Sequence, residues 1–228
     1  MKALVAVAKS REWVESEWED QFGTWKIPQG WQVRFGKLKQ FTAAERHNVS
    51  INEAKYNYDR ILWLDTDQVY PPEYLEMMLA HDESVVSALN VSRYYPFEIC
   101  IYKFEGEEGV NGIRYPKFTA IQPPTDQKIF HCDCTGTGAL MVDPKILDKL
   151  PMPYFKDIYD EEGCKRYCPD DFYFMWLLCK AGIKVIVDQN IIVKHIGKVL
   201  VSPYNARDMR RAWEKVNSGF GYWKDGKK

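Results

Sequence analysis

The segment Ile61-Leu62-Trp63-Leu64-Asp65-Thr66-Asp67 sets a short apolar run directly before an acidic turn. Four consecutive apolar residues predict a strand buried on both faces, as in a parallel sheet covered by helices. Ligands of open α/β sheets bind outside the carboxyl ends of the strands, so Asp65 and Asp67 stand where a ligand site is expected. Carboxylates one residue apart can converge on one divalent cation, because hard cations prefer oxygen ligands.

Strands and helices alternate over the first 79 residues, around this segment. Strands are expected at residues 3–8 and 31–38, and helices at 12–22, 42–56 and 71–79. Thr42, with Glu45 three residues later, forms a capping box that begins the second of these helices. The alternation predicts an α/β fold with a central mixed, mostly parallel sheet and helices on both faces.

The C-terminal side is less regular. Strands are expected at 85–91, 98–104, 128–132, 137–142, 183–187 and 191–194, and helices at 143–150 and 171–181. Glycines and prolines between Glu105 and Pro124 indicate a loose stretch. Gly182 is typical of a residue that ends a helix. One domain over residues 1–204 is predicted, followed by a basic, aromatic tail at 205–228.

Charge and composition exclude some classes of protein. The 228 residues carry a net charge of −1, so the whole chain is not an electrostatic nucleic-acid binder. Residues 207–228 hold seven basic and three acidic residues, which suits either a solvated tail or contact with an anionic surface. No apolar run approaches the roughly 18 residues of a membrane span, and Met1–Ala8 is too short for a signal peptide. A cytoplasmic protein is predicted, with a solvated tail as the favoured interpretation and peripheral contact of the tail with an anionic membrane as the alternative.

Two later features add chemistry to the acidic turn. Asp170 and Asp171 stand at a predicted helix start, where one can cap the helix and the second could act as a general base. His195 follows a predicted strand and is a plausible metal ligand beside an acidic turn. Gly136 and Gly138 lie in a small-residue turn that permits close approach of the backbone.

Taken together, four segments resemble the GT-A-fold glycosyltransferases, in particular the large family-two group. The segments, in chain order, are 61–67, 135–141, 170–172 with Ala181-Gly182 beyond, and 193–197. Each motif is weak alone, but four in this order and spacing are fairly specific. The resemblance implies a nucleotide-sugar-binding half at about 1–92 and an acceptor and catalytic half at about 93–204.

The resemblance also assigns roles to single residues. Asp65 and Asp67 match the Asp-x-Asp motif, with Asp67 as a metal ligand and Asp65 near the ribose or the metal. Asp170 and Asp171 match the acidic pair whose second member is the catalytic base of inverting enzymes. His195 matches a histidine that joins the metal shell in many members.

The nucleotide-binding half departs from the family pattern. Arg46 and Asn48 look like an Arg-Asn pair near the nucleotide, but His47 separates them. The usual Pro-x-Tyr-Asn turn and Asp-Asp-Gly-Ser segment are missing. Ser10 and Arg11, at the end of the first strand, are the best local candidates for contact with the donor. A UDP-linked donor is therefore an extrapolation from the family.

The implied reaction is metal-dependent transfer of a hexose from a nucleotide sugar to an acceptor hydroxyl, with Mn²⁺ or Mg²⁺ and inversion. The acceptor stays open among a glycan, a lipid-linked glycan, a protein, a small metabolite and a modified DNA base. Loops at 94–96, 106–124 and 153–167 are expected to shape its site. Two alternatives are a sugar-nucleotide nucleotidylyltransferase and a non-catalytic carbohydrate- or nucleic-acid-binding module. The first should carry a Gly-rich loop after the first strand, and residues 8–12 contain no glycine.

The cysteines allow one further metal hypothesis. Cys132, Cys134, Cys164 and Cys168 form two close pairs that could hold a structural zinc ion. The single residue between Cys132 and Cys134 is shorter than the usual spacing. Free thiols in a reducing compartment are therefore the favoured interpretation.

Overall fold

The computed structural model describes residues 1–8, 21, 23–38, 42–92, 97–196, 202, 206–208, 210 and 211. Several predicted features lie outside these residues: the helix at 12–22 except for residue 21, the donor-contact candidates Ser10 and Arg11, the acceptor loop at 94–96 and most of the tail.

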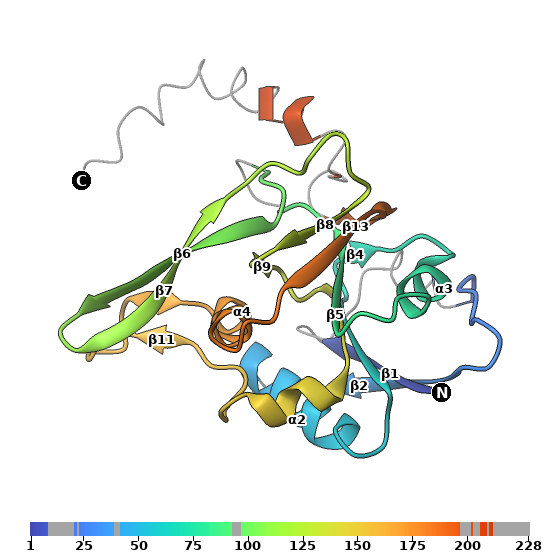
Figure 1. The fold of residues 1–228 in the computed structure, drawn as a ribbon, viewed down its shortest axis with the longest axis horizontal. Helices are drawn as coiled ribbons and strands as arrows, with labels where there is room; N and C mark the ends of the chain where they lie inside the picture. The colour runs from blue at the N-terminus through green and yellow to red at the C-terminus, as the bar shows by residue number, and fades with distance from the viewer. Residues whose placement is uncertain are drawn as a thin grey trace.

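A seven-stranded sheet forms the centre of the described structure (Figure 1), in the order β2-β1-β3-β10-β5-β13-β8. Its strands are β1 Lys2–Ala8, β2 Gln32–Leu38, β3 Arg60–Asp65, β5 Val85–Leu89, β8 Ile129–Cys132, β10 Ala139–Val142 and β13 Val185–Ile192. Only β10 and β8 run antiparallel to their neighbours. The predicted α/β class with a mixed, mostly parallel sheet is confirmed. Strands from both halves of the sequence share this sheet, since β10 lies between β3 and β5.

Helices cover both faces of the sheet, as the buried apolar strands predict. Helices α2 (Ala43–Ala54) and α4 (Asp170–Lys180) and the 3₁₀ helix η1 (Pro144–Lys149) pack on one face, and α3 (Tyr74–Leu79) packs on the other. Alternate residues of β1 divide between the two faces: Leu4 joins the cluster of α2 and α4, while Val5 joins that of α3. The sheet is therefore buried on both faces.

The predicted signals at two helix ends are confirmed. The Thr42 hydroxyl accepts a hydrogen bond from the Glu45 backbone N–H at 3.2 Å, and the Glu45 carboxylate accepts one from the Thr42 backbone N–H at 2.8 Å. Gly182 follows α4 with a φ of 71°, a left-handed conformation that glycine adopts without strain.

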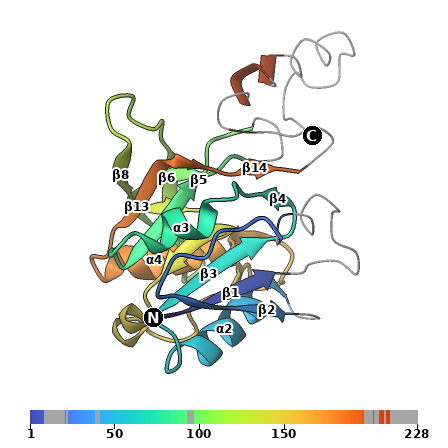
Figure 2. The ribbon, with the colours of Figure 1, turned by 90° about the vertical axis from the view of Figure 1, so that its right-hand side faces the viewer.

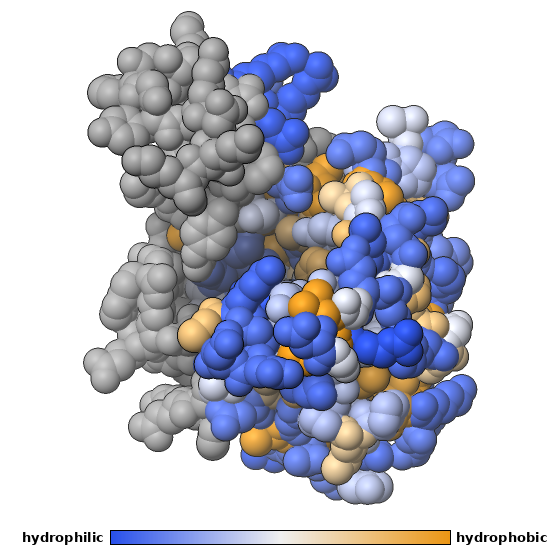
Figure 3. Space-filling model, turned by 90° about the vertical axis from the view of Figure 1, so that its left-hand side faces the viewer, coloured by the Kyte–Doolittle hydropathy of each residue, from blue (hydrophilic) through white to orange (hydrophobic). Residues whose placement is uncertain are grey.

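The stretch expected to be loose is instead a long hairpin, so that prediction is wrong. Strands β6 (Ile101–Val110) and β7 (Ile113–Ala120) pair antiparallel and project from the body of the molecule. Asn111 and Gly112 both have positive φ, 51° and 80°, as a tight two-residue hairpin turn requires. Asn-Gly is the sequence signal for this turn. Figure 3 shows the hairpin side of the molecule as largely hydrophilic, with small apolar patches.

The strands near the C-terminus also differ from expectation. Residues 185–192 form one bulged strand, β13, rather than part of two separate strands. The short strands β4 (Gln68–Val69) and β14 (Lys194–His195) then pair antiparallel, and Figure 2 shows them side by side. Three more short strands are β9 (Cys134–Thr135), β11 (Ile158–Tyr159) and β12 (Arg166–Cys168). Among the described residues no helix is long and apolar enough to cross a membrane.

Candidate active site

The backbone of the acidic turn after β3 is held by hydrogen bonds to the Tyr70 side chain. The buried Tyr70 hydroxyl accepts from the Asp65 backbone N–H at 2.9 Å and donates to the Gly138 carbonyl at 2.6 Å. This hydroxyl therefore ties the acidic turn to the chain that enters β10. Tyr70 belongs to none of the sequence motifs, so only the structure identifies its role in holding the acidic turn.

Gly138 lies against the Asp65 side chain. A Cβ atom at position 138 would stand 2.8 Å from the Asp65 carboxyl carbon and 2.9 Å from the Gln68 amide nitrogen. Real Cβ atoms essentially never approach other atoms so closely. The small-residue turn therefore allows the close backbone approach that its glycines suggest. At Gly138 the backbone approaches the side chains of the acidic turn.

His195 is brought to the acidic turn by the pairing of β14 with β4. The Ile196 backbone N–H donates to the Asp67 carbonyl at 2.7 Å, which fixes the register of this pair. The His195 Nδ1 atom lies 2.7 Å from the Val91 carbonyl, so Nδ1 carries the proton and donates. Its Nε2 atom is consequently directed at the Asp67 carboxylate, 3.4 Å from Oδ1.

The other acidic pair stands at the start of α4. The cap residue is Pro169, so the expectation that an aspartate caps this helix is wrong. Asp170 is buried and lies 3.2 Å from Nδ1 of His47 in α2. Asp171 instead lines a cavity, and its carboxylate accepts from the Phe172 backbone N–H at 2.8 Å.

One cavity of about 340 Å³ brings the predicted residues together: Asp65, Asp67, Asp171 and His195 all line it. It lies where the parallel strands β3, β5 and β13 end, which is the expected edge of an α/β sheet. Lining residues that the sequence motifs did not reveal include Gln68, Asn90, Ser92 and Tyr102.

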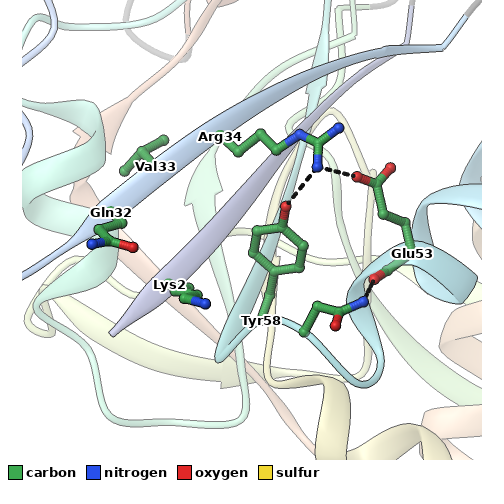
Figure 4. A pocket seen from close by; sticks show the side chains of 7 residues that line it. Lys2, Gln32, Val33, Arg34, Glu53 and Tyr58 are labelled. Atoms are coloured by element: carbon green, nitrogen blue, oxygen red, sulfur yellow. Dashed lines mark hydrogen bonds and ion pairs between the residues drawn. The ribbon is translucent and has the colours of Figure 1, made fainter.

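A larger hollow, of about 480 Å³, lies at the opposite edge, around the amino ends of β1 and β2. Figure 4 shows Arg34 directed at Tyr58 and Glu53 there, with contacts of 3.4 and 3.3 Å. The candidate residues of the acidic turn line the smaller cavity at the other edge, so size alone does not identify the site.

Electrostatics distinguish the carboxylates of the cavity. Burial raises the pKa of Asp171 to about 7, and the neighbouring charge of Asp170 acts in the same direction. Burial and the charge of Asp67 also raise the pKa of Asp65, while His195, His47 and Arg46 act to lower it. Burial lowers the pKa of His195, but its hydrogen bond and attraction to Asp67 outweigh burial and the net shift is upward.

The Arg-Asn pair predicted near the nucleotide divides between two places. Arg46 is buried, and its charge acts on the Asp65 carboxyl. Asn48 faces elsewhere: its side-chain amide donates to the Phe155 carbonyl at 2.8 Å and accepts from the Phe155 N–H at 3.2 Å. This pattern braces the segment around Phe155 against α2.

The thiols of the four cysteines in the zinc hypothesis contact backbone carbonyls close to them in sequence. Cys132 and Cys134 are buried, with their thiols on backbone carbonyls of neighbouring residues. The Cys164 thiol contacts the Glu162 carbonyl and the Cys168 thiol that of Pro169. Within the described part of the chain, no group of three or more histidine, cysteine or acidic side chains is gathered closely enough to hold a metal ion. The zinc hypothesis thus gains no support.

The donor set at the acidic turn nevertheless suits a hard divalent cation. Asp67 Oδ1 and His195 Nε2 lie 3.4 Å apart. Two neighbouring ligands of an octahedral ion bonded at ~2.1 Å lie ~3 Å apart. The backbone carbonyl on Nδ1 leaves Nε2 as the coordinating atom, which is how proteins commonly orient a ligating histidine. Asp67, His195 and, after a small side-chain movement, Asp65 could therefore hold Mn²⁺ or Mg²⁺.

No family model matches this sequence, and no curated protein matches it significantly. Among solved structures, A197 from STIV is similar over 90% of this chain and 91% of that one, with 13% identity and a TM-score of 0.59. This likeness shows a shared fold. GalNAc-T7 with UDP, GalNAc and Mn²⁺ is matched over 87% of this chain (10% identity, TM-score 0.49), and S. aureus TarS 1-349 in complex with UDP-GlcNAc over 93% (15% identity, TM-score 0.46). The chain spans 43% and 65% of those two, and at these TM-scores no conclusion follows from them.

Proposed function

We propose that the chain is a metal-dependent glycosyltransferase of the GT-A-fold type, which moves a sugar from a nucleotide sugar, with UDP as the proposed nucleotide, to an acceptor hydroxyl. The observation that carries this proposal is the meeting of Asp65, Asp67, Asp171 and His195 around one cavity at the carboxyl edge of the sheet. Three widely separated segments of the chain supply these side chains. The resemblance of the four sequence motifs supports the same assignment.

Asp171 is the proposed general base. A base works best when its pKa lies near the working pH, and burial beside Asp170 brings the pKa of Asp171 to about 7. Its carboxylate lines the cavity and can take the proton of an acceptor hydroxyl there. Direct displacement assisted by one base inverts the sugar carbon, so inversion is the proposed stereochemistry.

The acidic turn and His195 are proposed to bind the donor. When bound, a divalent cation supplies positive charge for the diphosphate oxygens of the donor. Asp67 and His195 are its proposed ligands, and Asp65 is assigned to the metal or the ribose. The nearby charge of Arg46 also favours a phosphate-bearing ligand. Contacts of Ser10 and Arg11 with the donor remain proposals, while Asn48 is assigned to bracing rather than to the nucleotide.

One screen tests the proposal. Nucleotide sugars are incubated with the full chain with and without Mn²⁺, and release of the nucleoside diphosphate is measured. Glycosyl transfer predicts metal-dependent release from one class of donor, and a much lower rate for Asp171→Asn. Calorimetry with Mn²⁺ and UDP should show that this variant still binds the nucleotide. An absence of metal-dependent nucleotide affinity would favour a non-catalytic binding module instead.

A further inference from the structure

A second histidine lies close to the proposed base but outside the cavity. His47 is 5% exposed, and its Nδ1 atom is 3.2 Å from Oδ2 of Asp170, which is 8% exposed. This pair joins the middle of α2 to the first turn of α4. A buried carboxylate needs a donor, and His47 provides one from another helix.

The imidazole of His47 is held on several sides. It stacks on the Phe155 ring, with centroids 4.4 Å apart and an interplanar angle of 28°. The Trp63 ring meets it edge-on at 5.5 Å. The side chain of Asn48, the next residue, hydrogen-bonds both the backbone N–H and the backbone carbonyl of Phe155. Little freedom therefore remains for the ring to turn away from Asp170.

We propose that His47 is a positioning residue, which holds the Asp170 carboxylate in place and thereby orients Asp171 and keeps a negative charge beside it. This inference rests on the proposed role of Asp171 as the base. Asp170 and Asp171 are consecutive in the first turn of α4. A displacement of the Asp170 backbone therefore also displaces Asp171. Among the hydrogen bonds of the described residues, the Asp171 carboxylate accepts only from its own helix, from the Phe172 backbone N–H.

Groups from several elements act on the Asp171 carboxyl. They are Asp170 in α4, His47 in α2, Asp65 at the end of β3, and Cys100, Tyr102, Cys134 and Cys168 around it. After burial, the charge of Asp170 is the largest cause that raises the pKa of Asp171. Loss of this charge should therefore lower the pKa of Asp171.

Three substitutions separate positioning from general stability. His47→Leu removes the donor at similar volume, whereas His47→Asn keeps a donor near the place of Nδ1. The matched control is His81→Leu, because His81 and Asp188 form another largely buried histidine–aspartate pair at 3.0 Å, and neither lines the cavity. His81 also contacts the exposed Glu83 carboxylate at 3.3 Å, which stays in contact with solvent when His81 is replaced. Both leucine variants leave a buried carboxylate without its histidine and should lose similar stability.

Transfer kinetics are the first readout. A displacement of about 1 Å at a base can cost about 10²-fold in rate. We expect His47→Leu to lower kcat by that order with little change in the KM of the donor, His47→Asn to recover most of the loss, and His81→Leu to keep the wild-type kcat. A wild-type kcat in His47→Leu, or an equal loss in His81→Leu, would overturn the inference.

The second readout needs no activity. The ¹³C carboxyl resonance of Asp171, assigned by its loss in Asp171→Asn, is titrated in the wild type and in Asp170→Asn, whose amide oxygen can still accept from His47. The midpoint should fall in Asp170→Asn, and an unchanged midpoint would overturn the inference. If the wild type transfers no sugar while the midpoint falls, the proposed function fails and the link between Asp170 and Asp171 stands.

Discussion

Replacement of Gly138 by alanine tests the packing of the acidic turn. The new methyl carbon would stand 2.8 Å from the Asp65 carboxyl carbon and nearer still to its Oδ2 oxygen, whereas ordinary contact begins at 3.4 Å, so the carboxyl must retreat by at least about 0.6 Å. The Gln68 amide, 2.9 Å from the same methyl, blocks a second direction. The backbone cannot yield easily, because Tyr70 binds both the Gly138 carbonyl and the Asp65 N–H.

The expected losses follow from this displacement. Catalytic groups tolerate shifts of only ~0.5 Å, and a misplacement of ~1 Å costs about 10²-fold, so kcat/KM of Gly138→Ala should fall by ~10- to 100-fold. Overpacking of a tight site costs about 1–3 kcal/mol, so the free energy of unfolding should fall by that amount.

Three measurements check the Gly138→Ala prediction: kcat/KM of sugar transfer, Mn²⁺-dependent UDP affinity by calorimetry, and thermal unfolding. Gly136→Ala is the control for unfolding, because Gly136 lies in the same turn and a methyl group there would meet no atom within 4 Å. Gly136→Ala should keep wild-type stability. If Gly138→Ala bound Mn²⁺ and UDP as tightly as the wild type and unfolded at the same temperature, the close packing of Gly138 on Asp65 would be refuted.

Other substitutions test the remaining parts of the site. Initial rates of transfer should rise with pH up to about 7 and then level off, because Asp171 must lose its proton to act as a base; a rate that falls over this range would exclude that role. Folded Asp171 keeps its proton up to about pH 7, whereas an ordinary aspartate loses it near 3.8, so stability should fall as pH rises through this window. Asp171→Asn should therefore raise Tm increasingly between pH 4 and 7, as calorimetric scans without metal would show. His195→Ala should weaken Mn²⁺-dependent UDP binding by at least ~10-fold and leave metal-free binding unchanged. Tyr70→Phe should lower the free energy of unfolding by about 0.5–1.5 kcal/mol in urea denaturation, since the Asp65 N–H and the Gly138 carbonyl then keep only the long hydrogen bond of 3.3 Å between them.

Much of the fold can be predicted from the sequence because the signals for its strands and helix ends are local. The apolar run before Asp65 predicts a doubly buried strand, and β3 is one, with helices over both of its faces. The box of Thr42 and Glu45 predicts the start of α2, and Gly182 predicts the end of α4. The Asn111-Gly112 turn is also a local signal, but the many glycines, prolines and charges around it conceal the hairpin. The two strands β6 and β7 pair with each other across this turn.

The order of residues along the chain also determined which side chains could meet. Asp65, Asp67 and His195 follow strands that run parallel, and the carboxyl ends of such strands lie at one edge of a sheet. Their shared cavity follows from that rule.

Tertiary structure alone decided how those side chains are supported. Tyr70, the residue directly after β4, bridges the acidic turn and Gly138, and His47 reaches Asp170 across 123 positions of the sequence. Such contacts depend on the register of β4 with β14 and on the packing of α2 against α4, which side-chain volumes set and no short sequence pattern records. The sequence thus determines the chemical groups and the edge at which they gather, whereas the packed structure determines which of them face the cavity and which are held behind it.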